Sequence, residues 1–308
     1  EFHNSSPAGK TVRVAAVVTC DPERGGTGRP RSLQWSEEPC GLLQRTLERL
    51  GRSEQLSVIL VLVPDHFDCE SVIDRSRIDL PVEIYRCGEK VFGPEHEAIR
   101  AARAFSGTAW RGGIHGLCAA DEVFAPVPTL AALQSFDCQA ALVVGADWTL
   151  LPVGGEAGVD QVIRRFREQP ELDFTFNQAP PGLGGVVLGC SLLEEFTAER
   201  SRYGTLGYLL GYRPEHPEHD CITRDNNVTT PPGIRSAAHR FIMDSEQTRR
   251  MMSSRLADEE IDPGELVGIA GDHLLQGNSG FGPNHLQVEI IAGQLNSEGS
   301  PPEMMELG

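Results

Sequence analysis

Three runs of strand length that are apolar at nearly every position, with Arg13 and Ser57 as the polar exceptions, constrain the fold of this chain more than any other feature. They cover Val12–Val18, Ser57–Pro64 and Ala140–Val144. A strand that is apolar at every position suits a parallel sheet with helices on both faces, because neither face of the strand then meets water. We therefore expect the three runs to be central, neighbouring strands of a mainly parallel sheet.

Segments with helical periodicity alternate with the strands. The clearest is Gly41–Leu50, whose four leucines fall on one face. The other expected helices are Pro94–Phe105, Pro128–Phe136, Val159–Glu168, Ser191–Glu199, Ser245–Leu256 and Pro263–Leu275, and the other expected strands are Val82–Arg86, Asp173–Asn177, Gly185–Leu188, Ala238–Met243 and Leu286–Ile291. The alternation predicts a three-layer, Rossmann-like α/β sandwich, and the short strands around 173–188 predict an antiparallel element.

Length and composition bound the class of protein. The 308 residues suffice for one large domain, which we expect over 12–291, with a disordered end or expression remnant at 1–11 and a linker or tail at 292–308. A formal net charge of −17 argues against nucleic acid or an anionic membrane as partner. The eight cysteines form no C-x-x-C pair, and no recognisable signal peptide precedes them, so we expect reduced thiols in a cytoplasmic protein.

The segment AALVVGADWTLL places one carboxylate, Asp147, directly after the third apolar run. Ligands of open α/β sheets bind beyond the carboxyl ends of the strands, so Asp147 stands where a metal ion or a nucleotide phosphate would be held. The alternative is that Asp147 caps a turn or a helix, a common use of aspartate.

A loop rich in glycine and arginine follows the first apolar run. Arg24–Arg31 contains three glycines and three arginines in eight residues. Backbone amides exposed by Gly25 and Gly26 can wrap phosphates, and Arg29 and Arg31 can chelate them. The loop matches neither the Walker motif nor G-x-G-x-x-G, and a surface loop without function is the alternative.

This strand, loop and amphipathic helix resemble the opening of nucleotidyltransferases of the glycosyltransferase-A type. Gly25, Gly26 and Arg29 fit the family's loop, and LLQRTLERL fits its helix. The lysine that this family places after the arginine is absent. The resemblance implies a glycosyltransferase-A-like fold that binds a nucleoside triphosphate.

Two later segments extend the resemblance to cytidylyltransferases for sugar acids. Gly145–Leu151 resembles the strand end at which that family's aspartate binds the catalytic metal, which implies this role for Asp147. His239–Met252 resembles a late strand and helix whose first aspartate is the second metal ligand, which implies this role for Asp244. The two aspartates would then lie close together and hold Mg²⁺ as catalytic residues. Asp244 would otherwise serve as a helix N-cap.

A narrower resemblance rests on six short motifs. They are Trp110–Gly113, Asp121–Phe124, Gly145–Leu151, Gln178–Leu183, His219–Asp220 and Arg224–Asp225. Together they resemble the nucleotidyltransferase-like domain upstream of radical SAM/SPASM modules in some bacterial proteins. This resemblance implies a covalently linked radical SAM domain after residue 291.

Arg111 and His115 lie in a glycine-rich loop and can bind a phosphate or a sugar carboxylate, unless the loop is only a tight turn.

The function we expect is metal-dependent transfer of a nucleotidyl group from a nucleoside triphosphate to a sugar acid, a sugar phosphate or a related acceptor. One alternative is a non-catalytic module that binds a substrate or positions a radical SAM partner, as the missing lysine would allow. Another is a glycosyltransferase that uses a nucleotide sugar.

Overall fold

A computed structural model describes most of the α/β portion of the chain. The described residues are 12–26, 41–88, 122–198, 206, 226–235, 237, 239–244, 246–256, 258 and 260–275. Within these ranges, none of the helices has the length and apolar character needed to cross a bilayer.

Seven strands form one mixed sheet in the order β3-β2-β1-β4-β6-β5-β7. The strands are β1 (Val14–Thr19), β2 (Val58–Val63), β3 (Val82–Arg86), β4 (Ala140–Gly145), β5 (Phe174–Asn177), β6 (Val186–Gly189) and β7 (Asn227–Val228). The first four in this order are parallel, and β6 runs antiparallel to both β4 and β5. The expected central neighbours β2, β1 and β4 therefore lie side by side, and the expected antiparallel element is present.

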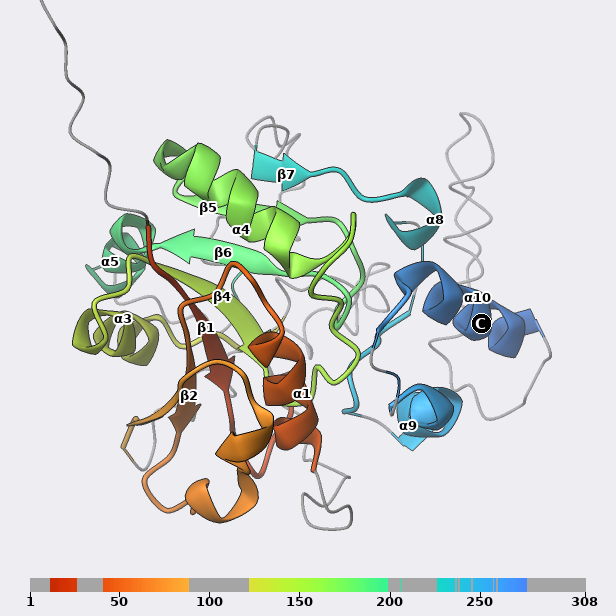
Figure 1. Cartoon of the computed structure of the whole chain (residues 1–308), viewed down its shortest axis with the longest axis horizontal. Coiled ribbons are helices and arrows are strands. Elements are labelled where there is room, and N and C mark those ends of the chain that lie inside the picture. Colours follow the sequence, from red (N-terminus) through yellow and green to blue (C-terminus); the bar gives the residue numbers. More distant parts are fainter. Residues whose placement is uncertain are drawn as a thin grey trace, which may run out of the picture.

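Helices cover both faces of the sheet (Figure 1). The helices on the two faces are α1 (Leu42–Gly51), α3 (Pro126–Ser135), α4 (Val159–Glu168) and α5 (Cys190–Ala198). The other α-helices of the described residues are α8 (Pro232–Arg235), α9 (Glu246–Met252) and α10 (Pro263–Leu275). Side chains of β1 alternate between two cores: Val14, Ala16 and Val18 pack with α1 and α4, whereas Ala15 and Val17 pack with α3 and α5. This confirms the three-layer sandwich.

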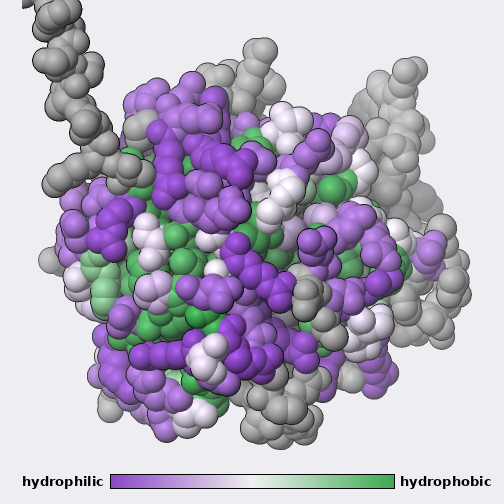
Figure 2. Space-filling model, in the orientation of Figure 1, coloured by the Kyte–Doolittle hydropathy of each residue, from purple (hydrophilic) through white to green (hydrophobic). Residues whose placement is uncertain are grey.

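Helix α4 shows how the sequence produces this layering. Val159, Val162, Ile163 and Phe166 recur at helical spacing and are buried against the sheet. Hydrophilic residues cover most of the outer side of α4 in the view of Figure 2, whereas hydrophobic residues show mainly over the strands. The amphipathic pattern therefore fixes which side of the helix faces the core.

Helices α8, α9 and α10 lie together beside one end of the sheet (Figure 1). They form a third apolar cluster, to which the loops after β4 and β5 contribute Leu150 and Leu183. This cluster anchors the segment between α8 and α9, which carries Asp244.

One predicted strand is wrong. The described residues of Ala238–Met243 are irregular, because their backbone amides pair with two separate segments rather than with one strand. The amide of Phe241 donates to the Pro181 carbonyl at 2.8 Å, and that of Met243 donates to the Asp147 carbonyl at 3.1 Å. The segment is thus tied to two loops and joins no ladder.

The other predicted elements that lie in the described residues agree with the structure to within two residues at each end, except at the end of α9, where Ser253–Arg255 form a 3-10 turn. The short strand β7, the short helix α8 and the 3-10 helices at 70–72, 75–77 and 170–172 were not predicted. The predicted helix Pro94–Phe105 and strand Leu286–Ile291 lie outside the described residues. The segments expected to flank the domain, 1–11 and 292–308, also lie outside the described residues.

Candidate functional site

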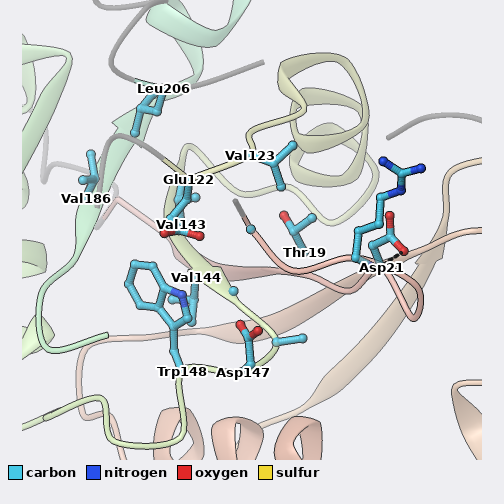
Figure 3. Close-up of a pocket in the computed structure, with 14 residues that line it drawn as sticks. Thr19, Asp21, Glu122, Val123, Val143, Val144, Asp147, Trp148, Val186 and Leu206 are labelled. Carbon is cyan, nitrogen blue, oxygen red and sulfur yellow. Dashed lines mark hydrogen bonds between the residues drawn. The ribbon is translucent and has the colours of Figure 1, made fainter. Parts of the chain in front are cut away.

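A pocket opens where β1 and β4 end side by side. Thr19 pairs with Gly145 in the parallel register, so the loops that follow the two strands emerge at the same edge. Asp147 follows β4 with 1% of its surface exposed and lines the pocket together with Thr19 and Glu122. Figure 3 shows the carboxylates of Glu122 and Asp147 pointing into this space from opposite sides. This is the edge at which open α/β sheets bind ligands.

The loop that carries Asp147 is held by backbone contacts on both sides of it. The amide of Ala146 donates to the Thr19 carbonyl at 3.2 Å, and the Thr46 hydroxyl donates to the Ala146 carbonyl at 3.0 Å. The Nε of Arg49 donates to the Thr149 carbonyl at 2.5 Å. Burial lowers the pKa of Arg49 to about 10, which leaves its guanidinium charged at neutral pH. Helix α1 therefore fixes the loop independently of the Asp147 charge.

The start of the glycine- and arginine-rich loop also belongs to the site. The Asp21 carboxylate accepts hydrogen bonds from the amides of Glu23 and Arg24 at 2.7 and 3.1 Å and so forms a tight turn. Gly26 lies against Glu122, whose Oε2 would be 1.8 Å from a Cβ at position 26. A side chain at this position would displace the Glu122 carboxylate, so the close approach requires glycine.

A buried ion-pair network lies beside the pocket. Arg240 donates to Glu122 Oε1 at 2.5 Å and to Asp244 Oδ2 at 2.6 Å. Burial raises the pKa of Glu122 to about 7, against the lowering effect of Arg240, and the charges of Asp244 and Asp147 raise it further. Burial disfavours the charged form of Arg240, but the two carboxylates more than offset this and raise its pKa.

The structure brings Asp147 and Asp244 into adjoining segments. The Met243 amide bonds to the Asp147 carbonyl at 3.1 Å, and both aspartates act electrostatically on Glu122. Three carboxylates and one guanidinium carry a formal charge of −2, which suits a divalent cation. Among the described residues, no cluster of three or more His, Cys, Asp or Glu side chains is arranged to hold a metal ion. Mg²⁺ commonly takes one or two carboxylates and completes its shell with water and phosphate, so two aspartates are the kind and number of protein ligands that it uses.

Of the other predicted site residues, Gly25 and Gly26 are described in the loop after β1, and Gly26 lines the pocket. Arg29, Arg31, Arg111 and His115 lie outside the described residues.

Sequence reasoning missed the ionic contact of Glu122 and Arg240, which are 118 positions apart. Glu122 belongs to the short motif Asp121–Phe124, and Arg240 belongs to His239–Met252. The only available signal was therefore that each lies in a segment that resembles the same family.

Comparisons with known proteins agree with this geometry at the level of the fold. No family model matches the sequence, and curated proteins give no significant match either. A solved cytidylyltransferase from Leptospira borgpetersenii is similar with a TM-score of 0.54 and 13% identity, over 85% of this chain and 94% of that chain. The chain therefore has a nucleotidyltransferase fold of the glycosyltransferase-A type, and the expected fold class is confirmed.

Two further structures are more distant. One is 4-diphosphocytidyl-2C-methyl-D-erythritol synthase from Anaerococcus prevotii, with a TM-score of 0.44 and 9% identity over 80% of this chain and 96% of that chain. The other is CMP:2-keto-3-deoxy-manno-octonic acid synthetase with CTP, with a TM-score of 0.33 and 7% identity over 61% of this chain and 78% of that chain. The resemblance to cytidylyltransferases therefore rests, at the level of the fold, on the Leptospira structure alone among these three. None of these comparisons bears on a radical SAM partner.

Proposed function

We propose that this protein transfers a nucleotidyl group from a nucleoside triphosphate to a sugar acid or a similar small acceptor, with the help of a divalent metal. The observation that carries the proposal is the position of Asp147. It follows a central parallel strand, lines the pocket at the sheet edge and adjoins the Asp244 segment by a backbone hydrogen bond. In the cytidylyltransferase fold, this edge is where the nucleotide phosphates would bind.

In this proposal, Asp147 and Asp244 would hold Mg²⁺, which neutralises phosphate charge as pyrophosphate leaves. Gly25 and Gly26 would present backbone amides to the triphosphate, and Arg29 and Arg31 would add positive charge. Arg111 and His115 would contact the acceptor. The proposed reaction does not require a covalent nucleophile from the protein, because positioning and charge stabilisation account for most of phosphoryl-transfer catalysis.

Arg240 would have a positioning role. Its two short contacts fix the Glu122 and Asp244 carboxylates relative to each other. Since Arg240 pairs with Asp244 at 2.6 Å, cation binding would require the Asp244 carboxylate to share its charge between the guanidinium and the metal. A carboxylate has two oxygens and about four lone-pair sites, so both contacts are compatible.

The missing lysine favours a second candidate, a non-catalytic module that binds a nucleotide or a substrate without turnover. A radical SAM domain linked after residue 291 would be the partner that such a module positions. Glycosyl transfer from a nucleotide sugar would use the same fold and the same metal carboxylates, and it differs in releasing a nucleoside diphosphate.

Pyrophosphate release decides between these candidates. The protein would be incubated with each of the four ribonucleoside triphosphates, Mg²⁺, and either glucuronate as a sugar acid or glucose 1-phosphate as a sugar phosphate. We expect acceptor-dependent release that is at least about 100-fold slower in Asp147→Asn, because the amide keeps the shape but loses the charge that holds the cation. Asp137→Asn is the matched control, because its carboxylate is 89% exposed.

Each alternative predicts a different outcome. Calorimetric binding of a triphosphate without turnover would support the non-catalytic module, and loss of that heat in Arg29→Ala would place the phosphates at the loop. Release of a nucleoside diphosphate from a nucleotide sugar would support glycosyl transfer. The absence of both binding and turnover would refute the proposal.

A further inference from the structure

The indole N–H of Trp148 is buried without a hydrogen-bond partner. Trp148 is 3% exposed, and its Nε1 makes no hydrogen bond in the structure. A buried indole N–H ordinarily finds an acceptor, because leaving it unpaired costs about 1–3 kcal/mol. An orphaned donor beside a pocket therefore calls for an acceptor that arrives with a ligand.

The N–H edge of Trp148 and the Asp147 carboxylate both lie close to Gly145, and all three residues line the same pocket. A Cβ at Gly145 would lie 2.6 Å from Trp148 Nε1 and 3.1 Å from Asp147 Oδ1. Because glycine has no side chain, this donor and this acceptor approach each other closely enough for one small group to contact both. Figure 3 shows the indole nitrogen on the side of the ring that faces Asp147.

The hydrogen-bonding properties of Trp148 and Asp147 determine which ligand group can bind to both residues. A hydroxyl accepts a hydrogen bond from an N–H and donates one to a carboxylate, whereas an ionised phosphate or carboxylate oxygen can only accept. A hydroxyl is thus the common substrate group that satisfies both Trp148 and Asp147.

Part of the pocket wall is apolar. Val143, Val186 and Leu206 line it, and Figure 3 shows Val186 and Leu206 on the side away from Asp21. The C–H faces of a sugar pack well on such a surface while its hydroxyls keep polar partners.

We propose that Trp148 is a specificity-determining residue that donates a hydrogen bond from Nε1 to a hydroxyl oxygen of the substrate, which in turn donates to Asp147. The inference rests on the proposed function and narrows its substrate to one that presents a hydroxyl at this point. The hydroxyl comes either from the acceptor or from the ribose of the nucleotide.

The indole resonances of the protein test the proposal directly. The chain has three tryptophans, so its ¹⁵N–¹H spectrum has three indole signals, and the one missing in Trp148→Phe is that of Trp148. Calorimetry first identifies which of CTP with Mg²⁺, glucuronate and glucose 1-phosphate bind. We expect a bound hydroxyl to move the Trp148 signal downfield and to slow its exchange with solvent.

The source of the hydroxyl follows from which ligand moves the signal. A shift with CTP that is lost with 2′-deoxy- or 3′-deoxy-CTP assigns it to the ribose, and a shift with glucuronate or glucose 1-phosphate assigns it to the acceptor. A Trp148 signal that stays unchanged while these ligands bind overturns the proposal and leaves the proposed function intact. If calorimetry detects no binding of any of these ligands, both the Trp148 proposal and the proposed function are refuted.

Kinetics supply a second measurement. Trp148→Phe keeps an aromatic ring but lacks the N–H, so we expect the KM of the hydroxyl-bearing substrate to rise about threefold to tenfold, the effect of one hydrogen bond. The KM of the other substrate should stay within about twofold. Phe166→Leu is the matched control, because Phe166 is also 3% exposed but lies in the core on α4. An equal rise of both KM values in Trp148→Phe would mark Trp148 as merely structural and contradict the proposal.

Discussion

The segments that carry Asp147 and Asp244 adjoin each other, but different interactions hold them in place. Asp147 directly follows a central strand, and helix α1 holds the carbonyls on both sides of it, at Ala146 and Thr149. Asp244 lies in an irregular segment, and its carboxylate is tied to Arg240, a residue of the same segment. The sheet thus positions one aspartate, and a buried ion pair positions the other.

The difference matters because the two arrangements respond differently to loss of charge. Backbone contacts to Ala146 and Thr149 do not involve the Asp147 carboxylate. By contrast, Arg240 depends on two carboxylates for its burial, since its side chain is only 17% exposed. We therefore expect stability to depend on charge in the Asp244 segment and to be nearly independent of the charge of Asp147.

The largest effect should come from Arg240→Met. The substitution leaves the buried carboxylates of Glu122 and Asp244 without their cation, which should lower the free energy of unfolding by about 3–5 kcal/mol. Arg255→Met is the matched control, because Arg255 also pairs with two carboxylates, Asp258 and Glu265, but is 32% exposed. Its effect should stay below about 1 kcal/mol. Equal losses in urea denaturation would contradict the proposed distinction.

Much of the sandwich could be predicted from the sequence, because its strongest signals are local. A strand such as Val58–Val63 is apolar at every position, and α4 repeats its buried residues at helical spacing. Such patterns determine which face must be buried and need no knowledge of distant partners. The prediction that β2, β1 and β4 are central neighbours followed from the rule that apolar strands occupy the centre of a parallel sheet, whereas the order of the remaining strands was not predicted.

The region around Asp244 could not be predicted in the same way. Phe241, Ile242 and Met243 are apolar and fully buried, as in a strand. However, Phe241 and Met243 pack with two loops and the helices α9 and α10, whereas Ile242 belongs to the core between the sheet and the helices α1 and α4. Local hydrophobicity reports burial and does not report which backbone provides the hydrogen bonds. The contact between Glu122 and Arg240 depends on the tertiary fold, and no sequence spacing encodes it.

Gly182→Ala tests how tightly the Asp244 segment is packed against its neighbouring loop. Gly182 has a φ of 90°, and a Cβ there would lie 2.4 Å from the Phe241 carbonyl oxygen. We expect backbone strain and the clash together to cost about 3 kcal/mol. Gly155→Ala is the control for strain alone, since Gly155 has a φ of 77° and nothing within 4 Å of its Cβ position. Its cost should be about 1 kcal/mol. Equal melting temperatures of the two variants would refute the close packing.

Asp244→Asn and Asp147→Asn compare the two aspartates with the same change of charge. Asp244→Asn weakens a charge-assisted hydrogen bond to Arg240 and should cost about 2 kcal/mol in metal-free buffer. Asp147→Asn should leave the melting temperature in that buffer unchanged. Asp258→Asn provides a control at a partly exposed ion pair with Arg255. A large fall in the melting temperature of Asp147→Asn would instead identify Asp147 as a structural cap.

The smallest expected effect is the contribution of Glu122 to the pH dependence of the free energy of unfolding. Its pKa is about 7 in the folded protein against an ordinary value of 4.5 for glutamate, chiefly because of burial. Between these values the folded state binds the proton more tightly than the unfolded chain does. The stability that Glu122 contributes is therefore full below about pH 4.5 and is lost as the pH rises through about 7.

Glu122→Gln should remove this dependence, because the amide does not titrate. We expect the unfolding free energy of the parent protein to fall relative to Glu122→Gln by about 1 kcal/mol per pH unit between pH 5 and 7. Urea denaturation at a series of pH values measures the difference, and Glu54→Gln is the control at an exposed position. A difference that stays constant with pH would mean that Arg240 keeps Glu122 ionised throughout. The charges of Glu122, Arg240 and Asp244 would then not change over this pH range. The Asp244 segment would in that case be as insensitive to pH as the backbone contacts around Asp147.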